Sequence, residues 1–195
     1  METVSIPQAV DRLFFLLEQR HVEYSLGGGM ALHFYIQTPG ISDLVLLMDL
    51  SALENLPELT ISSQEGFFVH TEFEGEPVEI WLTQNPLFFK VCCNFSETRR
   101  YLDHDVPMVT VEGLLLLKMF ALPSVYRQGS FAEVSIHEAE IATLLYDHEP
   151  NITHLLDELA MYLNDEDVTE VISIILDIQK RINRYKKGSF RTVVQ

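Results

Sequence analysis

The spacing of hydrophobic positions changes near residue 109 and divides the chain into two kinds of sequence. Before that point, short apolar runs alternate with glycine-rich or acidic turns, which predicts strands between helices. After it, apolar residues recur every three or four positions, which predicts helices. We therefore expect an α/β or α+β core at residues 1–109, a helical subdomain at 110–186 and a short basic tail at 187–195.

The first part predicts the order helix, strand, glycine turn, helix and then several strands. A helix is expected at 7–20, a strand at 23–26 and a second helix at 30–36. Further strands are expected at 43–49, 58–63, 66–74 and 77–82, with a short one around 99–103. The apolar segment 88–95 fits either a helix or a strand, because it is short and has no clear period.

Four helices are predicted in the second part, one beginning at Thr110 and others at 135–146, 151–163 and 166–185. The last carries one continuous apolar stripe, formed by Val168, Val171, Ile172, Ile175, Ile178 and Ile182. Such a stripe favours packing within the same domain. A second apolar face, of which Ile174 would be part, would instead favour a homodimer or a contact with another protein.

Composition excludes several classes of protein. With 195 residues and 47% apolar residues, the chain can bury a sizeable core and is not disordered. No apolar run is long enough to cross a membrane, and the N-terminus lacks a signal peptide's basic start. The two cysteines, Cys92 and Cys93, are adjacent and fit reduced thiols better than a disulfide. We therefore expect a cytoplasmic protein without a membrane partner.

The charge is unevenly distributed. The net charge is −16, yet the segment from Lys180 to Gln195 holds six basic residues and no acidic one. The other 179 residues thus carry 29 acidic and 7 basic side chains, a net of −22. Because such a body repels nucleic acid, any contact would need a local patch, either this tail or Arg99 and Arg100. The simpler interpretation of the tail is a solvated end that docks on the protein's own acidic surface, and we prefer it to nucleic-acid binding.

Three consecutive glycines separate the first predicted strand from the helix that follows it, in the segment YSLGGGMALHFY. Gly27, Gly28 and Gly29 would let the backbone approach a phosphate, with helix N–H groups directed at it. The same glycines could simply allow close helix–strand packing. They do not have the GxGxxG spacing of a dinucleotide site, and the chain has no P-loop.

Asp43 begins the next predicted strand. Acidic residues two apart on a strand share a face, and with a third from a neighbouring strand they could hold divalent metal ions that neutralise a triphosphate. The seven histidines are scattered and form no zinc motif.

The ordered set of motifs resembles the nucleotidyltransferase superfamily, especially its minimal and abortive-infection-type toxin members. The motifs are LGGGMAL at 26–32, SDLVLLM at 42–48, VEI at 78–80 and LLLLKMFA at 114–121. The resemblance implies a mixed β-sheet core with flanking helices and a C-terminal helical subdomain. It also implies that Gly27, Gly28, Gly29 and Lys118 bind the triphosphate. Asp43 and Glu79 would hold Mg²⁺ and serve catalysis, and the reaction would transfer NMP from NTP to a hydroxyl.

One position departs from the family pattern, because Val45 stands where the second acid is expected. Asp49 lies six residues after Asp43, roughly 20 Å along a strand, and cannot replace it. A second hypothesis is therefore an inactive member that binds a nucleotide or a protein partner, such as a toxin or antitoxin subunit. Under it, Asp43 caps a strand, Glu79 is solvated and the stem of Lys118 lies along apolar surface.

Overall fold

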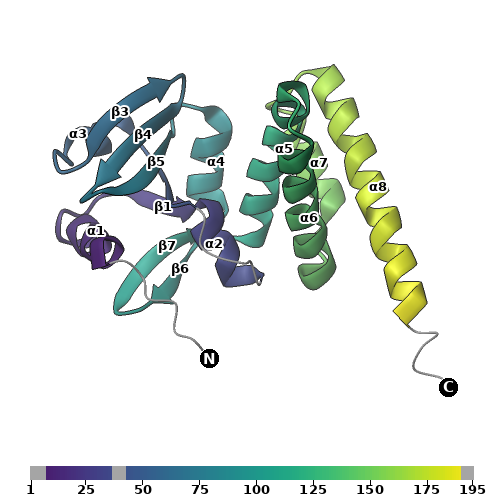
Figure 1. Cartoon of the computed structure of the whole chain (residues 1–195), viewed down its shortest axis with the longest axis horizontal. Helices are drawn as coiled ribbons and strands as arrows, with labels where there is room; N and C mark the ends of the chain where they lie inside the picture. The colour runs from purple at the N-terminus through teal and green to yellow at the C-terminus, as the bar shows by residue number, and fades with distance from the viewer. Residues whose placement is uncertain (1–7, 37–42, 190–195) are drawn as a thin grey trace. The chain divides into compact units, whose positions relative to one another are not determined.

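A mixed sheet forms the centre of the first of two units, Met1–Gly113, in the computed structural model, which describes residues 8–36 and 43–189 (Figure 1). Ser42 of the second motif and Arg191 of the tail lie outside the described residues. In the described part the sheet has seven strands in the order β3-β4-β5-β2-β1-β7-β6. The strands are β1 Tyr24–Gly27, β2 Val45–Met48, β3 Thr60–Glu65, β4 Phe68–Phe73, β5 Glu76–Leu82, β6 Ser96–Tyr101 and β7 His104–Val109.

The pairing at the centre of the sheet is mixed. Strand β1 runs antiparallel to β2 and parallel to β7, while β2 runs parallel to β5. Every residue of β1 and β2 is buried, so both strands lie inside the fold. The predicted mixed β-sheet core with flanking helices is thereby confirmed.

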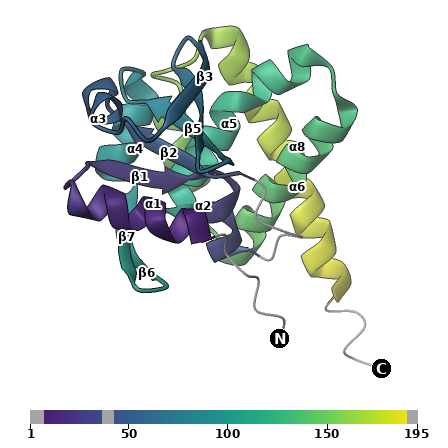
Figure 2. The same cartoon turned by 60° about the vertical axis from the view of Figure 1, so that its left-hand side comes forward.

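Helices cover both faces of this sheet. They are α1 Gln8–Gln19, α2 Gly28–Tyr35, α3 Leu50–Glu54 and α4 Pro86–Asn94. Phe14 of α1 stacks on Tyr24 of β1, with ring centroids 6.5 Å apart. Cys92 of α4 lies against the next residue of β1, with its Sγ 3.3 Å from Oγ of Ser25. Because successive side chains of a strand point to opposite faces, α1 and α4 cover opposite faces of β1, as the turned view in Figure 2 also shows.

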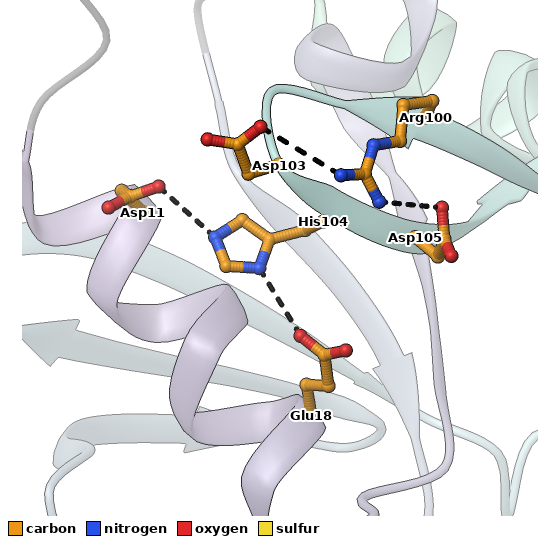
Figure 3. Close-up of polar contacts among 6 residues, drawn as sticks. All are labelled: Asp11, Glu18, Arg100, Asp103, His104 and Asp105. Atoms are coloured by element: carbon orange, nitrogen blue, oxygen red, sulfur yellow. Dashed lines mark hydrogen bonds and ion pairs between the residues drawn. The ribbon is translucent and has the colours of Figure 1, made fainter.

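A buried histidine fastens α1 to the sheet. His104 begins β7 and lies between two carboxylates of α1 (Figure 3). Its Nε2 is 3.1 Å from Oδ1 of Asp11, and its Nδ1 is 3.4 Å from Oε2 of Glu18. Since these carboxylates are two helical turns apart, the contact sets both the rotation and the position of α1 along β7. On the same hairpin, Arg100 contacts Asp103 and Asp105.

Several predicted elements differ from the structure. The segment left open at 88–95 belongs to α4, which Asn85 caps by accepting hydrogen bonds from the N–H groups of Leu87 and Phe88. The strand expected around 99–103 is the hairpin of β6 and β7. The strand expected at 43–49 spans only Val45–Met48. It starts late because Asp43 precedes the first ladder pair, and it ends early because Asp49 caps α3.

The second unit, Leu114–Gln195, is helical in its described part. Its helices are α5 Val111–Gln128, which begins in the first unit, α6 Phe131–His148, α7 Ile152–Leu159 and α8 Asp165–Ser189. The core of α6, α7 and α8 consists of buried aliphatic side chains, Ile141, Leu144, Leu155, Leu159, Val171, Ile175 and Ile178. An ion pair of 2.6 Å between Arg127 of α5 and Asp167 of α8 adds a polar contact.

The stripe predicted on the last helix is only partly buried. Val171, Ile175 and Ile178 lie in the core, whereas Ile172 is exposed together with Leu176, which the stripe did not include. None of the helices in the described part of the chain combines the length and apolar character required to span a bilayer.

Candidate functional site

The glycine turn between β1 and α2 brings the backbone close to the next strand. Gly27 ends β1, and Gly28 opens α2 with a φ of +64°, a conformation that favours glycine. A Cβ atom on Gly28 would lie 2.5 Å from Cγ2 of Val45 and 2.6 Å from Oδ2 of Asp43. Both the backbone conformation and the lack of space therefore require glycine at position 28.

Asp43 is bound to the first turn of α2. Its Oδ1 accepts a hydrogen bond of 2.9 Å from the N–H of Gly29, and its backbone carbonyl accepts one of 3.1 Å from Met30. A carboxylate at a helix N-terminus is favoured by the helix dipole and satisfies an N–H group that lacks a partner within the helix. The structure thus places Asp43 directly beside the glycine turn and gives it a structural role there.

The sheet register places Glu79 on the same face as Asp43. Val45 pairs with Gly27 on one side and Glu79 on the other, and Glu79 pairs with His70 of β4. Paired residues of neighbouring strands project from the same face, and Asp43 shares this face because it lies two residues before Val45. The Cα atoms of Asp43 and Glu79 are therefore about 8 Å apart, from the strand rise and spacing.

Two neighbours orient the Glu79 carboxylate, which is partly exposed. Its Oε2 accepts a hydrogen bond of 3.2 Å from Nε1 of Trp81, and its Oε1 is 3.7 Å from Nδ1 of His70. Sequence reasoning missed Trp81 and His70. The alternation of β5 could have indicated Trp81, which lies two residues after Glu79, but the position of His70 depends on the pairing of β4 with β5.

Val45 lies between the two carboxylates and is 0% exposed. Among residues 8–36 and 43–189, no group of three or more histidine, cysteine or acidic side chains is placed to hold a metal ion. Mg²⁺ usually takes one or two carboxylates and completes its shell with water and substrate phosphates. The donor set of Asp43 and Glu79 fits one such ion, whereas a valine at the central position does not fit a two-metal site.

Lys118 lies on α5 in the second unit. Its Nζ is 2.7 Å from Oε2 of Glu140 on α6, and the two side chains are only 16% and 23% exposed. Sequence reasoning missed this partner because Glu140 lies 22 residues away on another helix. The contact gives Lys118 a structural role within the helical unit, and its predicted role at a triphosphate remains a prediction.

Replacing Lys118 by methionine is expected to destabilise the protein by about 1 to 3 kcal/mol, because Glu140 then keeps a poorly solvated charge without its partner. The double variant Lys118→Met/Glu140→Met should lose less than Lys118→Met alone. Urea unfolding of the three proteins measures the coupling. A Lys118→Met protein of unchanged stability that binds nucleotide more weakly would contradict the structural role.

A cavity of about 590 Å³ lies at the opposite end of β2, where Met48 and Asp49 contribute to its wall together with Cys92 and Cys93. Some of its polar groups already have partners. The Asp49 carboxylate accepts hydrogen bonds from Ser51 and Gln84, and burial raises the pKa of the Cys92 thiol. The cavity is separate from the Asp43 and Glu79 face.

No protein-family model matches the chain, and no curated protein is significantly similar in sequence. Solved structures are similar in fold. An antigenic nucleotidyltransferase-like protein from Paracoccidioides brasiliensis superposes with a TM-score of 0.51 at 16% identity, over 86% of this chain and 91% of that one.

The antibiotic-resistance factor ANT(2'')-Ia is similar in two structures. Its solution structure superposes with a TM-score of 0.52 at 10% identity, over 93% of this chain and 96% of that one. Its crystal structure in complex with adenylyl-2''-tobramycin superposes with a TM-score of 0.52 at 11% identity, over 90% of this chain and 99% of that one. At these identities the similarity establishes the fold, which is nucleotidyltransferase-like.

Proposed function

We propose that this chain binds a nucleoside triphosphate with one Mg²⁺ at the glycine turn and transfers the nucleotidyl group to a hydroxyl acceptor. The observation that carries the proposal is the common face of Asp43 and Glu79 beside the turn of Gly27 to Gly29. The fold supports it by analogy, since one structurally similar protein was solved in complex with adenylyl-2''-tobramycin.

The chain's own groups suit a bound triphosphate in two ways. The positive end of the α2 dipole lies beside the glycine turn and would favour an anion there, although the N–H groups of Gly29 and Met30 already donate to Asp43. Asp43 and Glu79 would hold the Mg²⁺, which would neutralise phosphate charge, and Trp81 and His70 keep the Glu79 carboxylate oriented. In the transfer, the acceptor oxygen forms a bond to the α-phosphorus, the bond from that phosphorus to the bridging oxygen breaks and releases pyrophosphate, and the hydroxyl proton passes to solvent.

A second candidate function is binding without transfer, in which the chain binds a nucleotide or a protein partner such as a toxin or antitoxin subunit. Val45 favours this candidate, because its buried side chain occupies the place of a bridging carboxylate. Asp43 favours it as well, since one of its oxygens already accepts the Gly29 N–H.

Calorimetric titration with ATP, GTP, CTP and UTP tests the site, with and without Mg²⁺. We expect Mg²⁺-dependent binding that Glu79→Gln weakens about tenfold or more, because even residues that merely orient a metal ligand change metal affinity by 10- to 100-fold. Glu54→Gln is the matched control, since Glu54 is an exposed carboxylate of α3, which follows the opposite end of β2. It should bind as the unaltered protein does.

Transfer of label from α-phosphate-labelled nucleotide to an acceptor then separates the two candidates. Binding with transfer supports the enzyme, and binding without transfer to any hydroxyl acceptor supports the second candidate. A folded protein that binds no nucleotide would contradict both transfer and nucleotide binding, and would leave only the protein partner of the second candidate.

A further inference from the structure

One face of α8 is exposed although it carries two large apolar side chains. Ile172 is 36% and Leu176 is 48% exposed, and the two lie one helical turn apart. The core face of the same helix is formed by Val171, Ile175 and Ile178, which are 0% exposed. The helix therefore packs one stripe into the core of its own unit and leaves Ile172 and Leu176 exposed near its middle.

The exposed residues along this second face form a regular line, which we call the outer stripe. Its members are Asp165, Thr169, Ile172, Leu176, Lys180, Asn183 and Lys187, all of them exposed. The steps between them are four, three, four, four, three and four positions. Steps of three and four keep residues on one side of a helix, so the line runs along most of α8. The same steps read identically in both directions from Leu176.

The two ends of the outer stripe carry opposite charges at equal distances from its centre. Asp165 is acidic and Lys187 basic, and each lies eleven positions from Leu176, about 16 Å along the helix. A second α8 laid antiparallel, with the two-fold axis at Leu176, brings Asp165 of each copy opposite Lys187 of the other. A parallel arrangement would bring like charges together at both ends, which is unfavourable.

We propose that the protein forms a homodimer by antiparallel packing of the outer stripes of two α8 helices. Leu176 meets its own copy at the two-fold axis, and the aliphatic stem of Lys180 covers Ile172 of the other subunit. The ion pairs of Asp165 with Lys187 close the two ends. Because each subunit contributes a single helix face, the interface is small and the dimer dissociates on dilution.

Sedimentation equilibrium over a concentration series tests the dimer. The mass should rise from the 22.4 kDa of one chain toward twice that value, and Leu176→Glu should remain monomeric at every concentration. Phe131→Glu is the matched control, because Phe131 is an 86% exposed apolar residue of α6 and lies outside the outer stripe. It should dimerise normally, with helical content unchanged in all three proteins. A monomeric unaltered protein, or a dimeric Leu176→Glu protein, would overturn the proposal.

Charge exchange tests the orientation. Asp165→Lys should weaken dimerisation roughly tenfold, because each dimer then has two repulsive pairs. Adding Lys187→Asp to the same chain restores opposite charges and should recover most of the affinity. If the double variant dimerises no better than Asp165→Lys alone, the antiparallel register is wrong.

Disulfide trapping gives an independent answer in a Cys92→Ser/Cys93→Ser background. Leu176→Cys should form a disulfide-linked dimer under mild oxidation, because the axis brings position 176 against itself. Asp165→Cys should not, since in the antiparallel dimer two copies of position 165 lie at opposite ends. Cross-linking through Asp165→Cys would indicate a parallel dimer and overturn the proposal.

Discussion

Val45→Asp is expected to lower the stability of the metal-free protein by about 3 to 5 kcal/mol, because it places a carboxylate at a fully buried position beside two others. The same substitution completes the acidic set of Asp43, position 45 and Glu79 on one sheet face. Mg²⁺ should therefore bind the folded variant more tightly than the unfolded chain and recover part of the lost stability. Saturation at 100 times the dissociation constant would return about 2.7 kcal/mol.

Thermal unfolding across a Mg²⁺ series measures this effect. Val45→Asn is the control, since asparagine has the shape of aspartate but lacks the charge that a divalent ion requires. It should be destabilised with little recovery by Mg²⁺. A Val45→Asp protein whose melting temperature does not respond to Mg²⁺ more than the unaltered protein would show that the three positions do not converge on one ion.

Gly28→Ala is expected to destabilise the protein by about 2 to 6 kcal/mol, the sum of a left-handed backbone strain and an overpacking cost of about 1 to 3 kcal/mol each. The new methyl group would meet Val45 and Asp43 at distances shorter than real contacts allow. Nucleotide binding should fall with stability, because Asp43 must move away from the N-terminus of α2. Chemical unfolding and calorimetry measure the two effects separately.

Gly66→Ala separates the two contributions. Gly66 also has a positive φ, of +58°, but a Cβ atom there meets nothing within 4 Å. It should therefore show the backbone strain alone and leave nucleotide binding unchanged. Equal destabilisation by the two substitutions would mean that Val45 and Asp43 move aside without lowering stability. The close approach of the backbone at Gly28 would then contribute nothing to the need for glycine there.

Elements with strong local signals could be predicted from the sequence. The alternating runs at 58–63, 66–74 and 77–82 correspond to β3, β4 and β5 within two residues. The apolar run of α4 has no clear period and fits a helix or a strand, although Asn85 followed by Pro86 is a typical helix start that favours the helix. Strand β7 was not predicted because Pro107 weakens its pattern, and only the pairing with Thr98 in β6 shows that the strand forms.

The candidate site could be predicted only as a set of residue types in a familiar order. The positions of Gly28, Asp43 and Glu79 follow from the motifs, but their common face depends on the register of β2 with β5, which no local signal sets. For the same reason the contacts of Glu79 with Trp81 and His70 could not be seen. The structural use of Asp43 as a helix cap depends on tertiary packing as well.

The parallel pairing of β1 with β7 has a consequence for the order in which the protein can fold during synthesis. Leu26 pairs with Met108, 82 positions later, so one side of the central strand β1 has no partner until the hairpin of β6 and β7 has left the ribosome. At 5 to 20 residues per second, that wait lasts on the order of 4 to 16 seconds. During it, that edge of β1 remains unpaired and open to wrong strand pairings, and faster elongation shortens the exposure.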